Sequence, residues 1–394
     1  MTDSPQTSAH TRMAWLDALR GVAAVAVLAE HTLQAVMPTL RPYWCNLGIY
    51  GVLVFFLVSG YIIPTSMERR GDLRAFWISR ALRLYPLYVA VIGLTLALSW
   101  WIPVRDAVPR DLSAVAAHAT MLTDVVGVAT VVDPMWTLSY EMVFYLVAAA
   151  LQAGGLHHRA GVAALVFAVG GLSAGLLFSG PPLTGGWLVW VSSAGLAAGL
   201  ACVFLRRAAV LAACGLGLGA ILLLFLSSRA PWLGAAILAV MFIGTAINQW
   251  ERGTGRLWPV VPAAALVAVA PMWAVQAGWW WVQPDVWITT LAMAAVTFAV
   301  GMALRSSRVP RGLVWLGLIS YSLYLMHVPL LKILTALAGD LRAVPLPVQA
   351  LTLALVMAGI LAVSGLTYRL IEAPAQRLGR TLSLRFTRIG QGNR

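Results

Sequence analysis

The segment WLDALRGVAAVAVLAEHTLQAVM, residues 15–37, is long and apolar enough to cross a bilayer as a helix. It nevertheless contains four ionisable residues, Asp17, Arg20, Glu30 and His31. At about 100° per residue, Arg20 and His31 lie about 20° apart around the helix axis, and Asp17 lies about 40° from His31. A charged group that faces lipid costs about 2.5–3.5 kcal/mol, so this polar face is expected to point into the protein. It is either an Asp–Arg pair that fixes helix packing beside a core histidine, or part of a functional site.

The composition is typical of a helical membrane protein, since 60% of the 394 residues are hydrophobic and only 10% are charged. Soluble proteins carry about 25% charged residues, and the long unbroken apolar runs do not match the alternation of a membrane β-barrel. The net charge of +13 comes from arginines between apolar runs, which indicates topology and contact with anionic lipid rather than nucleic acid. The sequence therefore predicts an all-α polytopic bundle in the cytoplasmic membrane.

Twelve apolar runs follow one another along the chain, and about 10–12 of them are expected to span the membrane, because the Arg206–Arg207 turn and the proline-rich start of the ninth run can also be read as broken helices. The arginine-rich segment 73–84 is expected to lie at the membrane surface before the third run. Arginines in every second connection predict that both termini are cytoplasmic, with tails at 1–12 and 373–394 around a transmembrane domain at 13–372. The runs are 15–37, 46–65, 84–101, 136–152, 161–178, 187–205, 208–226, 232–247, 259–275, 286–304, 313–337 and 346–371.

Two ionisable residues are expected at similar depths in different spans. His31 lies about 9 Å from the outer end of the first run, and Glu141 lies about 8 Å from the outer start of the fourth. An imidazole held by a carboxylate is a general-base pair. Alternatively, Glu141 caps or pairs within its own span.

His327 lies in SYSLYLMHVPL, residues 320–330, about 21 Å above the inner start of its run and so at a similar level. Ser320, Tyr321 and Tyr324 precede it at helical spacing and form a polar seam. His327 is either functional or a core histidine that bonds a neighbouring carbonyl.

Arg80 and Arg83 share one face of a helix near the predicted cytoplasmic boundary. Guanidinium groups suit bidentate phosphate binding because their fork matches the phosphate oxygens. Arginines at such a boundary also bind lipid head groups or set topology.

Five ordered motifs together resemble the membrane-bound acyltransferase 3 family. They are LDALRGVAAVAVLAEH (16–31), GVLVFFLVSGYII (51–63), FWISRALRLYPLY (76–88), WTLSYEMVFYL (136–146) and ISYSLYLMHVPL (319–330). The resemblance implies an O-acyltransferase that moves an acyl group, usually acetyl, from cytoplasmic acyl-CoA to a hydroxyl of a sugar, cell-envelope glycan or secondary metabolite. It also implies that Arg20 and His31 match the arginine and histidine of the family's first helix, that Arg80 and Arg83 match its cytoplasmic arginine pair, and that Glu141 matches its fourth-helix acidic residue.

The expected mechanism assigns a role to each of these residues. Arg80 and Arg83 bind the CoA phosphates, and the pantetheine arm threads a channel lined by Arg20, Ser59 and Tyr61. His31, oriented by Glu141, then acts as the base or takes the acyl group itself. The expected acceptor-site residues are Asp17, Tyr324 and His327, and no metal is expected.

The alternative function is a proton-coupled transporter that uses Asp17, Arg20, Glu141 and His31 as a relay. Only the acyltransferase needs acyl-CoA, so the donor distinguishes the two hypotheses.

The chain departs from the family pattern at two points. The residue before the histidine is usually aromatic or apolar, whereas here it is Glu30, which either faces another neighbour or tunes His31. Twelve runs are counted where the family core has about ten. No esterase-like domain follows residue 371, so the chain resembles the stand-alone type.

Overall fold

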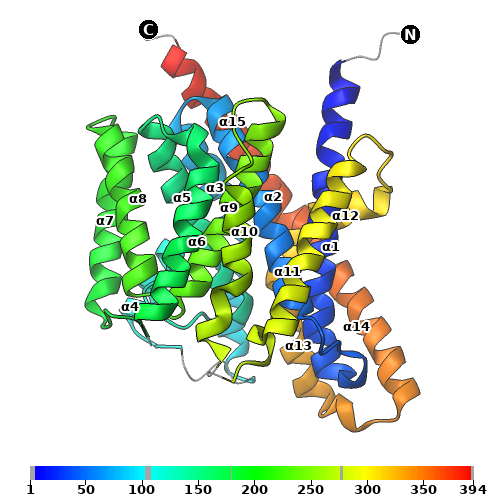
Figure 1. The fold of residues 1–394 in the computed structure, drawn as a ribbon. Coiled ribbons are helices and arrows are strands. Elements are labelled where there is room, and N and C mark those ends of the chain that lie inside the picture. The colour runs from blue at the N-terminus through cyan, green and yellow to red at the C-terminus, as the bar shows by residue number, and fades with distance from the viewer. Residues whose placement is uncertain (1–4, 103–107, 179, 276–277, 392–394) are drawn as a thin grey trace. The chain divides into compact units, whose positions relative to one another are not determined.

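The computed structural model describes residues 5–102, 108–178, 180–275 and 278–391. Every regular element in these ranges is a helix, which confirms the predicted all-α class (Figure 1). The longer helices are α1 (Pro5–Val36), α2 (Leu47–Arg70), α3 (Leu73–Leu98), α4 (Leu112–Thr120), α5 (Trp136–Ala153), α6 (Ala160–Leu177), α7 (Trp187–Phe204), α8 (Ala209–Leu226), α9 (Pro231–Glu251), α10 (Val260–Val269), α11 (Pro284–Ala303), α12 (Arg311–Leu318), α13 (Ser320–Ala338), α14 (Leu346–Thr367) and α15 (Ala373–Gln391). Short 3-10 turns lie at η1 (Pro38–Leu40), η2 (Asp133–Met135), η3 (His157–Arg159), η4 (Ala270–Trp273), η6 (Trp280–Val282) and η7 (Leu341–Ala343), and η8 (Tyr368–Glu372) is a π-helical turn between α14 and α15.

In the described part of the chain, ten helical segments are long and apolar enough to cross a membrane, so the expected number of about 10–12 spans is confirmed. The 32-residue α1 is not among the ten, although it is long enough, because it carries the four ionisable residues of segment 15–37. The ninth apolar run forms only a short helix at Val260–Trp273. At 1.5 Å per residue this segment is about 21 Å long, shorter than the ~30 Å hydrocarbon core.

Two helix boundaries differ from those expected. The arginine-rich segment 73–84 is not a separate surface helix but the first half of α3, which runs without a break through Pro86. The eleventh run is divided at Ile319 into α12 and α13. Hydrophobic periodicity does not reveal where these helices begin and end. An amphipathic segment and the apolar segment that follows it can have the same helical period and belong to one helix.

The chain forms two compact units. The first contains Met1–Val58, Pro86–Ile102 and Trp279–Pro374, and the second contains Ser59–Tyr85, Pro103–Gly278 and Ala375–Arg394. In the first unit α1 packs against α11, α12, α13 and α14 (Figure 1). Its apolar core includes Ala24, Leu28, Leu323, Leu331 and Ile360.

Glycines allow α1 and α12 to approach closely. A Cβ atom on Gly317 would overlap the backbone of Asp17, and one on Gly21 would meet the backbone carbonyl of Leu313. Small residues at helix contacts are typical of membrane bundles, where close packing replaces the hydrophobic driving force. The α1–α12 contact therefore depends on glycine from both helices.

In the second unit α9 packs against α5, α6, α8 and α10, and most of its residues are buried. A Cβ atom on Gly60 of α2 would overlap the backbone of Met241 in α9, and the Thr245 hydroxyl donates to the Gly60 carbonyl at 2.8 Å. Gly60 therefore sets the contact between this part of α2 and α9.

The connection between α3 and α5 is held by buried polar groups. His118 in α4 donates from Nδ1 to the Ala114 carbonyl at 2.8 Å, and its Nε2 accepts from the Val131 N–H at 3.2 Å. The Tyr140 hydroxyl donates to the Asp124 carboxylate at 2.5 Å. Because Nε2 of His118 is an acceptor here, this fold requires the neutral imidazole.

We expect the protein to lose stability as the pH falls below about 6.5, the ordinary histidine value. Burial holds the pKa of His118 in the folded protein below this ordinary value. Between the lower pKa of the folded protein and the ordinary pKa of the unfolded chain, the unfolded chain therefore binds more protons than the folded protein. In this pH range stability falls by up to about 1.4 kcal/mol for each pH unit. Thermal unfolding in detergent at pH 7.5 and 5.5 should show a larger drop for the wild type than for His118→Gln. An equal drop in both proteins would contradict this prediction.

Candidate functional site

His31 lies five residues before the end of α1 and is partly buried. Its Nδ1 lies 2.9 Å from the Val27 carbonyl oxygen. Because a carbonyl only accepts, Nδ1 carries the proton of the neutral ring and Nε2 keeps its lone pair. Among the described residues Nε2 has no hydrogen-bond partner. His31 therefore has the tautomer that a general base needs.

The structure brings His327 of α13 against His31. The two ring centroids are 4.9 Å apart, and the ring planes are inclined by 64°. Nδ1 of His327 faces the Leu323 carbonyl at 3.1 Å, whereas its buried Nε2 has no partner among the described residues. Tyr324 lies beside His327, with ring centroids 6.1 Å apart. His327 thus bonds a carbonyl of its own helix, as a core histidine would, and its ring also contacts the ring of His31.

A cavity of about 380 Å³ opens beside His31. It lies between the end of α1, the second half of α13 and the η7 turn, all in the first unit. A volume of this size is within the range of small-molecule pockets. A hydroxyl compound in this pocket would therefore lie next to the imidazole.

Asp17 and Arg20 pair with each other, with Arg20 Nη1 3.7 Å from Asp17 Oδ1. They lie 14 and 11 residues before His31 on α1, or about 21 and 16 Å along the axis. Neither residue lines the His31 pocket. Their expected roles at the acceptor and in the pantetheine channel stay predictions.

Glu30 does not act on His31, because it faces a different neighbour. Its carboxylate accepts from Arg41 Nε at 2.8 Å and Nη2 at 2.5 Å, and from the Leu47 N–H at 3.1 Å. The Arg41 guanidinium also lies over the Trp280 ring, 4.6 Å from its centroid. Glu30 therefore fixes the loop that follows α1. Of the two alternatives given for Glu30, the structure therefore favours the one in which its side chain faces another neighbour.

Arg80 of α3 is buried in the second unit. Its guanidinium lies over the rings of Phe76 and Tyr145, 5.7 and 5.6 Å from their centroids, and its Nε has no hydrogen-bond partner in the described part of the chain. Arg83, one turn further, is partly buried, and the charges of both arginines act on the Tyr145 hydroxyl. Among the described residues neither arginine forms a salt bridge.

Arg74, at the start of α3, has an acidic partner, unlike Arg80 and Arg83. Arg74 pairs with Asp72 at 2.7 Å, and Arg206 lies 3.7 Å from the same carboxylate. Burial acts to raise the pKa of Asp72, but the hydrogen bonds and charge of Arg74 and the charge of Arg206 outweigh it, so the pKa lies below its ordinary value. Arg74 thus has an ion-pair partner, whereas Arg80 and Arg83 form no salt bridge among the described residues.

Glu141 of α5 joins this cluster through its own helix, since it accepts a hydrogen bond from the Tyr145 hydroxyl one turn later. This agrees with the reading that Glu141 pairs within its own span. Tyr145 is not among the site residues predicted from the sequence, although its spacing of four residues from Glu141 is a usable signal. His31 and Glu141 belong to different units, and their expected pairing stays a prediction.

Ser59 and Tyr61 flank Gly60 at its contact with α9. Ser59 is buried, and the Tyr61 hydroxyl donates to the Glu251 carboxylate of α9. These contacts give the segment a structural role in helix packing. Its expected role in binding the donor stays a prediction.

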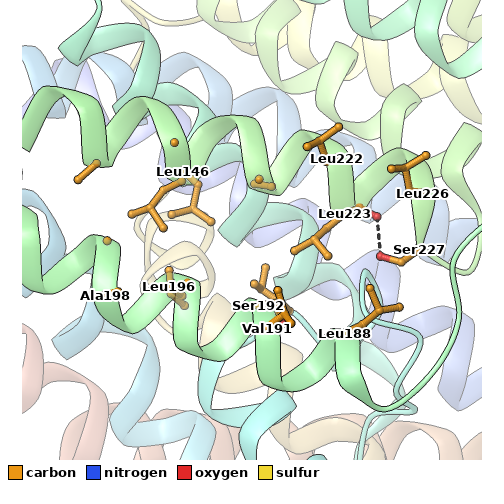
Figure 2. Close-up of a pocket in the computed structure, with 18 of the residues that line it drawn as sticks. Leu146, Leu188, Val191, Ser192, Leu196, Ala198, Leu222, Leu223, Leu226 and Ser227 are labelled. Atoms are coloured by element: carbon orange, nitrogen blue, oxygen red, sulfur yellow. Dashed lines mark hydrogen bonds between the residues drawn. The ribbon is translucent and has the colours of Figure 1, made fainter.

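A second cavity, of about 670 Å³, lies between α7 and α8 in the second unit. Figure 2 shows that leucine side chains dominate its walls, including Leu188, Leu222 and Leu226. The Ser227 hydroxyl donates to the Leu223 carbonyl at 2.9 Å, as the figure also shows, and to the Val125 carbonyl at 2.7 Å. Among the described residues that line this cavity there is no His, Asp, Glu, Lys or Arg, the usual acids and bases of acyl transfer. Among the described residues, no group of three or more His, Cys, Asp or Glu residues could hold a metal ion.

Ten long apolar helical segments, with polar clusters buried among them, define a multi-pass membrane protein. The model of the acyltransferase 3 family, described as an acyltransferase domain, matches residues 13–369. The chain belongs to this family.

Two curated relatives show the range of similar proteins. Acyltransferase MdmB of Streptomyces mycarofaciens is 32% identical over 149 residues, which cover 34% of this chain and 38% of the relative. Peptidoglycan O-acetyltransferase OatA of Listeria monocytogenes serovar 1/2a is 29% identical over 152 residues, which cover 34% of this chain and 23% of the relative. The match thus spans well under half of each relative's length. No solved structure matches the chain.

Proposed function

We propose that the protein is an integral membrane O-acyltransferase that uses acyl-CoA, most simply acetyl-CoA, and transfers the acyl group to a hydroxyl of a sugar, cell-envelope glycan or secondary metabolite. The observation that carries the proposal is the His31 imidazole, which has a fixed tautomer and lies at the edge of a pocket. Family membership supports the reaction class, and the relatives' names support acetyl as the acyl group.

The donor is proposed to bind at Arg80 and Arg83. Charged groups buried in a membrane bundle are normally paired, so two guanidinium groups that form no direct salt bridge among the described residues fit an anionic ligand. The phosphates of CoA are such a ligand, and the fork of arginine matches their oxygens. Tyr145 and Glu141 would hold this site in place, because Tyr145 contacts Arg80 on its ring face and Glu141 at its hydroxyl.

Chemistry is proposed to occur at His31. The acceptor O–H gives its proton to Nε2 of His31 while its oxygen attacks the thioester carbonyl carbon. The C–S bond then breaks, and the leaving thiolate takes the proton back from His31, which gives the acyl ester and free CoA. In the covalent alternative, Nε2 of His31 attacks the thioester carbonyl carbon, the C–S bond breaks and CoA leaves as the thiolate. The acceptor oxygen then attacks the acyl carbon, the C–N bond breaks to restore the neutral imidazole, and the acceptor proton passes to the thiolate. The slim pantetheine arm of CoA separates the phosphates that the arginines bind from the thioester that reacts.

We also propose that the protein lies in the cytoplasmic membrane with both termini in the cytoplasm. The arginine-rich connections support this orientation by the positive-inside tendency. In this orientation Arg80 and Arg83 lie toward the side that holds the acyl-CoA.

Acyl-CoA dependence tests the proposed function. Membranes that contain the protein are supplied with radiolabelled acetyl-CoA together with extracts of envelope glycans and small metabolites. We expect label in an ester-linked product, and release of free CoA that requires the extract. Membranes without the protein serve as the control. A protein that moves its substrate equally well without acyl-CoA would instead be the proton-coupled transporter.

A further inference from the structure

The pocket beside His31 combines apolar walls with a charged rim. Ala35, Val328 and Leu331 form part of the walls, and Lys332, Asp340 and Arg342 supply the charges. The pocket therefore offers a ligand both apolar contacts and charged groups.

Two of the three charges on the rim compensate each other. Arg342 Nε lies 2.8 Å from Asp340 Oδ1, and the Arg342 backbone N–H donates to the same oxygen at 3.1 Å. Hydrogen bonds from the Arg342 side chain hold the pKa of Asp340 below its ordinary value, so the pair is ionised at neutral pH and carries no net charge. Lys332 has no ion-pair partner among the described residues. Its ammonium is thus the uncompensated charge of the rim.

Lys332 is also the single lysine in the sequence, since the other 26 of the 27 basic residues are arginines. An ammonium is a compact point charge that binds phosphate or carboxylate without requiring a fixed geometry. Apolar walls strengthen such an attraction because they lower the local dielectric constant.

We propose that this pocket binds the acyl acceptor, and that the acceptor carries an anionic group, a phosphate or a carboxylate, which Lys332 binds near the reacting hydroxyl. The inference rests on the proposed function and specifies the substrate class of the same site. The anionic group belongs either to an envelope glycan or to a small metabolite.

The unique lysine permits a selective test. Open membrane fragments of the wild type and of Lys332→Arg are treated with the acetyl ester of N-hydroxysulfosuccinimide, which neutralises lysine but spares arginine. Transfer from radiolabelled acetyl-CoA is then measured on glycan and metabolite fractions. We expect treatment to lower the transfer rate of the wild type about tenfold or more. The untreated Lys332→Ala variant should show the same loss. Lys332→Arg should keep its transfer with and without the reagent, and any reaction at the N-terminal amine affects both proteins alike.

A bulky residue in the pocket gives a second measurement. Thr335 lines the pocket on α13, whereas Leu337, two residues later, is 83% exposed and does not line it. Thr335→Trp should lower transfer about tenfold or more, and Leu337→Trp should leave it unchanged. Binding of CoA to the purified variants should equal that of the wild type. This control separates loss of the acceptor site from loss of folding.

The product identifies the class and source of the acceptor. Mass spectrometry should find a phosphate or carboxylate in the labelled product, and the fraction that contains it distinguishes glycan from metabolite. A neutral product, or normal transfer by Thr335→Trp and Lys332→Ala, would overturn the inference while leaving the proposed function intact. If wild-type membranes yield no acyl-CoA-dependent product, the proposed function fails and the inference fails with it.

Discussion

Replacing His31 with alanine should lower acyl transfer by about 10²–10⁴-fold while acyl-CoA binding stays near that of the wild type. The structure motivates this expectation because Nδ1 of His31 is fixed on the Val27 carbonyl and Nε2 is left for proton transfer. Removal of the imidazole would remove the base but none of the guanidinium groups proposed to hold the donor. Transfer rates in membranes and CoA binding by purified protein measure the two effects separately.

An exposed histidine provides the control for this variant. His158 in the η3 turn lies in the second unit, and His158→Ala should transfer at the wild-type rate. Near-normal transfer by His31→Ala would refute the proposed base. Rapid quenching of the wild type with labelled donor and no acceptor distinguishes the two routes, because an acyl adduct on His31 would select the covalent one.

Replacing both Arg80 and Arg83 with alanine should weaken acyl-CoA binding by about 100-fold or more. A hydrogen bond to a charged group contributes about 1.5–3 kcal/mol, or roughly 10–100-fold in the dissociation constant for each arginine. Arg83→Lys should bind more tightly than Arg83→Ala, because lysine keeps the charge but loses the bidentate fork. Isothermal titration of detergent-purified protein with CoA measures these constants.

Arg69 is the matched control, since it is an exposed arginine near the end of α2 in the same unit. Arg69→Ala should bind CoA as the wild type does. Equal CoA binding by the double Arg80 and Arg83 variant and by the wild type would show that the donor binds elsewhere. A thermal unfolding curve for each variant excludes the trivial case in which loss of a buried arginine unfolds the second unit.

The fold class and the number of spans could be predicted because apolar runs of membrane length are local in the sequence. The similar depth of His31 and His327 could also be predicted, since helical rise converts residue number into distance along an axis. The partner to which a polar side chain hydrogen-bonds could not be predicted. Glu30 bonds to Arg41 rather than to His31, and this choice depends on the path of a loop. The spacing of four residues signals the bond between Tyr145 and Glu141, but the contact of Tyr145 with Arg80 joins α5 to α3, and such packing across helices leaves no periodic signal.

Two contacts of α1 have a mechanical consequence for the proposed reaction. Near its middle α1 is packed backbone to backbone against α12 at Gly317, and near its C-terminal end Glu30 is bonded to Arg41 and the Leu47 N–H. Sliding α1 along its axis would break the ion pair of Glu30 and force the close contact with α12 apart. His31 lies immediately after Glu30 and is therefore held at a constant height relative to α12. In the proposed mechanism the acyl donor and the acceptor must therefore move to the imidazole, since α1 is not free to carry it to them.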